Sequence, residues 1–132
     1  GHSEKAMKAI KAIRAKFKVN KLWESPPLHI LLTREDDVIV ARCLDLTVSS
    51  HGNGESDAIN SLTEAEKETI LSAIENNVIG EIYDPAHSKY WRMFNEAEAK
   101  QFNSQLKKTL KKSVSEILEN KLAHTNVEIS HA

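Results

Sequence analysis

Three aspartates and one cysteine are the residues of this chain best suited to chemistry. Asp36, Asp37 and Asp45 flank one apolar run, and three carboxylates brought together would suit a divalent metal and a hydrolytic reaction. A turn is the more ordinary interpretation of Asp36-Asp37, because aspartate side chains accept hydrogen bonds from nearby backbone N–H groups. Cys43 follows Arg42, which would lower the pKa of an exposed thiol, although its mid-strand position favours a small core residue.

The histidines and the known motifs give no further sign of catalysis. No helical His-Glu-x-x-His pair occurs among His29, His51, His87, His124 and His131. The sequence also lacks a P-loop, a glycine-rich dinucleotide fingerprint, paired-cysteine zinc spacing and a nucleophile elbow. We therefore expect no metal, no cofactor and no enzymatic activity.

The elements that would position these residues begin with apolar runs at residues 28–33 and 38–44, separated by a charged break. This pattern is typical of a β-hairpin. A third, more polar strand is expected over residues 47–51, and the Gly52-Asn53-Gly54 turn would close the sheet, since glycine tolerates positive φ. From Glu55 the hydrophobic period changes to about 3.6 residues, which predicts one long helix over residues 55–76.

The predicted central helix has an apolar face and an acidic face. Its apolar residues would cover one side of the sheet, while acidic residues would make its outer surface negative: Glu55, Asp57, Glu64, Glu66 and Glu68. A solvated surface is the common explanation of such a face, and a partner-binding surface is the alternative.

Amphipathic helices are expected at both ends of the chain. Residues 1–25 form the first segment, with Gly1-His2 as a tag scar and an apolar face at Ala6, Ile10, Ile13 and Phe17. Residues 26–94 form the core, with a last strand at 78–83 and an aromatic cluster at 89–94 that indicates packing or a binding surface. Residues 95–132 form a helix to about residue 122 and a frayed tail.

The C-terminal helix carries a long apolar stripe that exceeds what a small sheet can cover. This stripe predicts an oligomer interface, with a dimer favoured, and consists of Phe102, Leu106, Leu110, Val114, Ile117 and Leu118. Packing on the N-terminal helix or on a partner protein is the alternative.

Charge is unevenly distributed, although the formal net charge is only −1. Residues 1–25 hold seven Lys or Arg against two acids, whereas residues 54–100 hold four against ten. The acidic middle would attract a basic partner. The single cysteine and the lack of an apolar run of roughly 18 residues indicate a protein of the reducing cytoplasm, with no membrane span.

Residues 28–76 resemble the HicB family of antitoxins. The family's strand, acidic turn and strand correspond to residues 30–41, and its Ala-x-Cys-x-Asp-Leu-like stretch corresponds to Ala41-Arg42-Cys43-Leu44-Asp45-Leu46. Its Gly-Asp-Thr turn and helix correspond to Gly52-Asn53-Gly54 and residues 57–65. The chain departs from the family pattern in having Leu44 where proline is common, and no DNA-binding motif follows the core.

This resemblance implies an α+β fold: a small antiparallel sheet with one long helix packed on it, in β-β-β-α-β order, like part of ribonuclease H. It also implies a non-catalytic antitoxin that binds and neutralises a small, basic, RNA-cleaving HicA-like toxin. The expected partner surface is the acidic helix face of Glu55, Asp57, Glu64 and Glu68, which would block access of RNA to the toxin.

Three alternatives remain open at this point. The chain could be a nucleic-acid-binding module that uses Lys8, Lys11, Arg14 and the lysines of residues 107–112. It could be a degenerate metal-dependent hydrolase built on the three aspartates, or a stand-alone HicB-like protein of another role.

Overall fold

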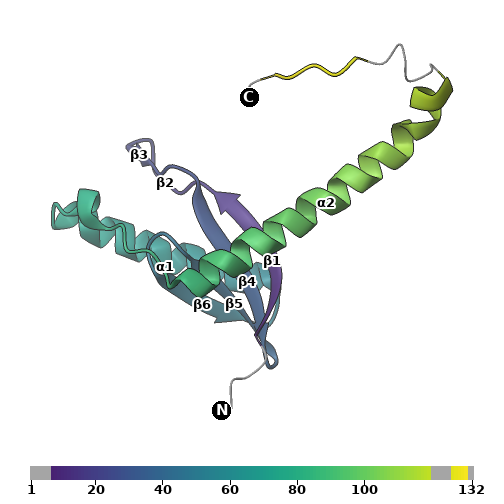
Figure 1. Cartoon of the computed structure of the whole chain (residues 1–132). Coiled ribbons are helices and arrows are strands. Elements are labelled where there is room, and N and C mark those ends of the chain that lie inside the picture. Colours follow the sequence, from purple (N-terminus) through teal and green to yellow (C-terminus); the bar gives the residue numbers. More distant parts are fainter. Residues whose placement is uncertain (1–6, 120–125, 131–132) are drawn as a thin grey trace. The chain divides into compact units, whose positions relative to one another are not determined.

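The computed structural model describes residues 7–119 and 126–130 (Figure 1). Contacts divide the chain into two units, residues 1–99 and residues 100–132. The first unit contains every strand of the described chain, helix α1 (Glu55–Glu75) and the first turns of helix α2 (Ser88–Glu119). The second unit contains the rest of α2 and a segment without regular secondary structure at residues 126–130.

A four-stranded antiparallel sheet forms the centre of the first unit. Its strands are β1 (Met7–Ala15), β4 (Leu28–Glu35), β5 (Val38–Cys43) and β6 (Val48–Gly52), arranged in the order β1-β4-β5-β6. The three strands expected from residues 28–33, 38–44 and 47–51 are therefore confirmed as β4, β5 and β6. Asp36 occupies the tight β4–β5 turn with φ of 58°, a conformation that aspartate tolerates better than most residues.

The N-terminal helix prediction is wrong, because that segment is edge strand β1. A register shift between Ala9 and Lys11 places an extra residue in the strand. Ile10 and Ile13 therefore both pack against the same core cluster, although a regular strand would point them to opposite faces. The bulge gives β1 the three-residue apolar spacing that resembles a helix.

A two-stranded hairpin of β2 (Lys18–Val19) and β3 (Trp23–Glu24) joins β1 to β4. Ser25 closes its base: its hydroxyl oxygen accepts a hydrogen bond from the Phe17 N–H at 2.9 Å, and its own N–H donates to the Phe17 carbonyl at 2.8 Å. Asn20 makes the reversal with φ of 52°. The hairpin therefore has a fixed base, despite having only two residues in each strand.

Helix α1 packs on one face of the sheet and confirms the long helix predicted after the third strand. Ala58 and Leu62 join Ile30, Ile39 and Cys43 in a buried apolar cluster. The backbone of Gly52 lies close to the first turn of α1. An added Cβ would lie 2.6 Å from the Ala58 nitrogen, so this position requires glycine. Positive φ is not the reason, since no described glycine has it.

The strand predicted at residues 78–83 is absent; a single 3-10 turn, η1 (Ile79–Glu81), lies there instead. Asn77 leaves α1 with φ of 56°, and the Val78 N–H bonds back to the Ala73 carbonyl, so the chain turns rather than extends. The edge of the sheet beside β4 is occupied by β1.

The first turns of α2 pack on the face of the sheet opposite α1 (Figure 1). Phe94 is fully buried there with Leu31, Leu44 and Ala12. The connection between the two helices is held by backbone bonds, in which the Asp84 and Ala86 N–H groups donate to the carbonyls of Asp45 and Leu44 at 2.8 and 2.7 Å. α2 begins at Ser88 rather than near Asn95, so the aromatic cluster of residues 89–94 belongs to its first turns and packs on the sheet.

Candidate functional site

The outer surface of α1 carries a straight line of four acidic residues, which we call the acidic line: Asp57, Glu64, Glu68 and Glu75. Successive residues of an α-helix are rotated by about 100°, so these four lie within about 40° of one another. All four are exposed, and within the described part of the chain none of them forms an ion pair. The line lies opposite the buried face of Ala58, Leu62 and Ile70.

The acidic line differs in part from the predicted partner surface. Asp57, Glu64 and Glu68 are brought together as expected. Glu55 is not, because it lies on the sheet side of the first turn and bonds to Lys11 at 3.1 Å. Glu75 was not predicted as part of this surface. It lies eighteen residues after Asp57, which is five full helical turns, so helical spacing alone places both on the same side of α1.

Glu66 was expected on the acidic surface but is completely buried. Neither of its carboxyl oxygens has a hydrogen-bond partner in the described chain. Burial raises the pKa of Glu66; contact with the Cys43 thiol lowers it in part, and the nearby charge of Asp45 raises it. A buried carboxyl without partners favours its neutral form. Because its side chain is buried, Glu66 is not part of the acidic surface.

Cys43 is a core residue rather than a reactive thiol. It is fully buried beneath α1, and burial raises its thiol pKa, as does the neighbouring Glu66. Arg42 points to the opposite face, where its Nη1 donates to Thr33 Oγ1 at 2.8 Å and Glu35 Oε2 at 2.9 Å. The lowered pKa considered from the Arg42-Cys43 sequence does not occur.

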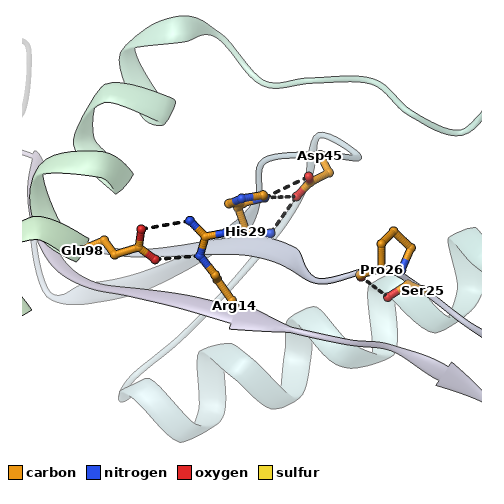
Figure 2. A network of polar contacts seen from close by, with 6 residues as sticks. All are labelled: Arg14, Ser25, Pro26, His29, Asp45 and Glu98. Carbon is orange, nitrogen blue, oxygen red and sulfur yellow. Dashed lines mark hydrogen bonds and ion pairs between the residues drawn. The ribbon is translucent and has the colours of Figure 1, made fainter. Parts of the chain in front are cut away.

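A polar cluster on the other face of the sheet fastens α2 to β1 and β4 (Figure 2). Arg14 Nε donates to Glu98 Oε2 at 2.8 Å, and Arg14 Nη2 donates to Glu98 Oε1 at 3.0 Å, which makes a two-bond fork. These bonds lower the pKa of the Glu98 carboxyl. The Arg14 guanidinium also lies 5.8 Å from the centre of the Phe94 ring. Because the partners are 84 positions apart in the sequence, no local pattern could have predicted this contact.

His29 and Asp45 form the second part of this cluster (Figure 2). The Asp45 carboxylate accepts the His29 backbone N–H at 2.7 Å, and its Oδ2 lies 3.1 Å from the ring Nδ1. A carboxylate that orients an imidazole is one component of general-base catalysis. Here the ring packs against Trp91 and Phe94 at centroid distances of 4.9 and 5.1 Å, and no nucleophilic side chain bonds to it in the described residues. The pair anchors the loop after β5 to β4.

The three aspartates considered for metal binding do not meet. Asp36 and Asp37 lie at the β4–β5 turn, whereas Asp45 follows the other end of β5, about 20 Å of strand away. No group of metal-ligating side chains occurs among the residues that the structure describes.

The basic N-terminal residues do not form the helical surface considered for nucleic-acid binding. They lie on β1 and at the start of the β2–β3 hairpin. Four cations contact acids: Lys11 with Glu55, Arg14 with Glu98, and Lys16 and Lys18 both with Glu24.

The second unit presents an apolar stripe along α2 that no described residue of that unit covers. Its members are between 48 and 67% exposed: Phe102, Leu106, Leu110, Val114 and Leu118. Ile117, predicted with them, lies in the helix, but its side chain is outside the described part. The tail beyond residue 119 is described only at residues 126–130, which have no regular secondary structure.

Within its described residues, the chain has no helix that is both long and apolar enough to cross a membrane. Comparison with models of known families, with curated proteins and with solved structures finds no match for this chain.

Proposed function

We propose that this chain is a HicB-like, antitoxin-type protein that binds and neutralises a small, basic, RNA-cleaving HicA-like toxin without catalysing a reaction itself. The observation that carries this proposal is the acidic line on α1. Three of its four members belong to the surface expected from the resemblance, and the line faces away from the sheet. Unpaired carboxylates in one row attract and orient a basic partner.

The order of elements after residue 28 supports the same proposal. β4, β5 and β6 followed by α1 have the β-β-β-α order that the resemblance implies. The strand that the resemblance implies after the helix is not present at residues 78–83, and β1 forms the edge of the sheet beside β4. In the proposed mechanism, the basic RNA-binding surface of the toxin lies on the acidic line. RNA is excluded because RNA and the acidic line compete for the same basic side chains of the toxin.

The chemistry of the first unit is consistent with a binding role. The His29–Asp45 pair is packed under the aromatic rings of α2, and the one cysteine is buried beneath α1. A single buried thiol is also consistent with the proposed cytoplasmic location.

The most direct test of neutralisation is an RNA-cleavage assay with a HicA-like toxin as the nuclease. We expect this protein to stop cleavage once it is present at about one copy per toxin, and to cleave no RNA by itself. Cleavage that persists at a large excess of this protein would refute the antitoxin proposal.

We further propose that the protein is a homodimer, or a larger oligomer, held together by the apolar stripe. Five large apolar side chains along one helix would lose most of their exposed surface against a second copy. Each is about half exposed, so burying the rest is worth on the order of 1 kcal/mol per side chain.

Light scattering tests the dimer. We expect the wild-type chain to show twice its monomer mass, and the double variant Leu106→Glu/Leu110→Glu to show the monomer mass. The matched control is Ser104→Glu/Lys108→Gln, which makes the same change in net charge on the opposite side of the helix and should stay dimeric. A wild-type monomer, or a dimer unaffected by the stripe variant, would contradict this interface.

A further inference from the structure

An apolar cavity of about 290 Å³ opens between α1 and the β1–β4 half of the sheet. It forms because α1 lies mainly over β5 and β6, so β1 and β4 are left partly uncovered on that face. Its floor is made by Ile30 and Leu62, which are 3 and 1% exposed. Its walls are the half-buried side chains of Ile13, Phe17 and Ile59.

The rim of this cavity is positively charged. Lys16 and Lys18 both line it, and both lie near the same carboxylate, Glu24, at 3.6 and 3.4 Å. One carboxylate neutralises only one of the two ammonium groups, so the rim keeps a net positive charge. Thr63, the remaining polar residue of the lining, uses its hydroxyl to donate to the Ile59 carbonyl of its own helix.

We propose that this cavity binds a free, single-chain aliphatic carboxylate, with the chain on Ile30 and Leu62 and the carboxylate at Lys16 and Lys18. Small-molecule sites are typically apolar hollows with a few polar groups that fix orientation, and this cavity lies at the lower end of their usual volume. The volume suits one medium-length chain. This site uses the flank of α1 and is independent of the acidic line.

Titration with decanoate, followed by calorimetry and by the thermal midpoint of the full chain, tests the proposal. Decanoate should bind saturably at one site per chain and raise the thermal midpoint. Decyltrimethylammonium, which has the same chain and the opposite charge, should do neither. Equal binding of both compounds would refute the role of the lysines, and no saturable binding of decanoate would refute the site.

Two pairs of variants locate the site. Thr63→Trp fills the mouth from an exposed helix position and should weaken decanoate binding at least tenfold, whereas Asn60→Trp, on the outer side of α1, should leave it unchanged. Lys16→Glu/Lys18→Glu should also weaken decanoate binding at least tenfold, and Lys21→Glu, on the same hairpin but outside the cavity, should leave it unchanged.

A membrane lipid is the alternative source of an aliphatic chain with an anionic group. Sedimentation with phosphatidylglycerol vesicles distinguishes it: the protein should remain in the supernatant. Co-sedimentation that Thr63→Trp prevents would overturn the proposal of a free ligand in favour of a lipid surface. If Thr63→Trp and Asn60→Trp bind decanoate equally, the ligand lies elsewhere and the proposal fails.

Discussion

Replacing Glu66 by methionine should raise the free energy of unfolding at pH 8 by about 2 kcal/mol, because a buried polar group without partners costs about 1–3 kcal/mol. Glu66 is fully buried against Cys43 and the sheet, and among the described residues neither of its carboxyl oxygens has a hydrogen-bond partner. Methionine has a similar shape, needs no hydrogen bond and tolerates irregular packing. Denaturant unfolding followed by circular dichroism measures the difference.

The stabilisation by Glu66→Met should depend on pH in one direction. Burial raises the pKa of Glu66 in the folded state above its ordinary value of 4.5. The folded state therefore holds this proton more tightly than the unfolded state does. The wild type loses stability as pH rises from 4.5 through the folded pKa, and the variant does not.

Two controls separate this effect from other titrations. The pKa of Glu35 is shifted in the opposite direction. Burial opposes its ionisation, but hydrogen bonds from Arg42 and Thr33 outweigh burial and lower the pKa. The stability that Glu35 contributes is therefore lost as pH falls. Glu35 is the same in both proteins, so the difference between their free energies of unfolding reports the titration of Glu66 alone. Glu64→Met, at an exposed position of the same helix, should change stability by less than about 0.5 kcal/mol. A Glu66→Met protein less stable than the wild type at pH 8 would show that the carboxylate makes a favourable contact.

The sequence predicted the part of the fold in which local pattern and tertiary packing agree. The strand-turn-strand of residues 28–44 and the start of α1 at Glu55 follow directly from apolar runs, turn residues and a change of period. β1 was mistaken because its bulge, placed between Ala9 and Lys11, gives a strand the spacing of a helix. The strand predicted at residues 78–83 is replaced by η1, because Asn77 turns the chain and the Val78 N–H bonds back to the Ala73 carbonyl. The apolar run alone does not report this turn.

The candidate surface was predictable to a similar extent. Helical spacing places Asp57, Glu64 and Glu68 on one side of α1, and the same rule extends the line to Glu75. Glu66 was assigned to the surface because glutamate is rarely buried without a partner. Its burial follows from its position between Leu62 and Ile70 on the sheet side of the helix, which the apolar periodicity alone also indicates.

Reversing charge along the acidic line should weaken binding to a HicA-like toxin about a hundredfold. Each exposed charge pair across an interface contributes up to about 1 kcal/mol, and a reversal replaces attraction by repulsion. Three reversals, Asp57→Lys, Glu64→Lys and Glu68→Lys, should therefore cost about 3 kcal/mol, which corresponds to that loss of affinity. Because these side chains are exposed and unpaired, the fold should be retained.

The matched control carries the same number of reversals at exposed acids elsewhere: Asp37→Lys, Glu81→Lys and Glu96→Lys. It changes the net charge equally, so it corrects for long-range attraction between the whole molecules. A loss of affinity confined to the α1 variant would be due to the acidic line itself. The loss should also shrink at high salt, because exposed pairs are screened.

The decisive measurement is the dissociation constant of a HicA-like toxin for the wild type, the acidic-line variant and the control, determined by calorimetry in one buffer. We predict tight binding by the wild type and the control, and binding about a hundredfold weaker by the acidic-line variant. Equal affinities for all three proteins, or no binding by the wild type, would contradict the assignment of this surface.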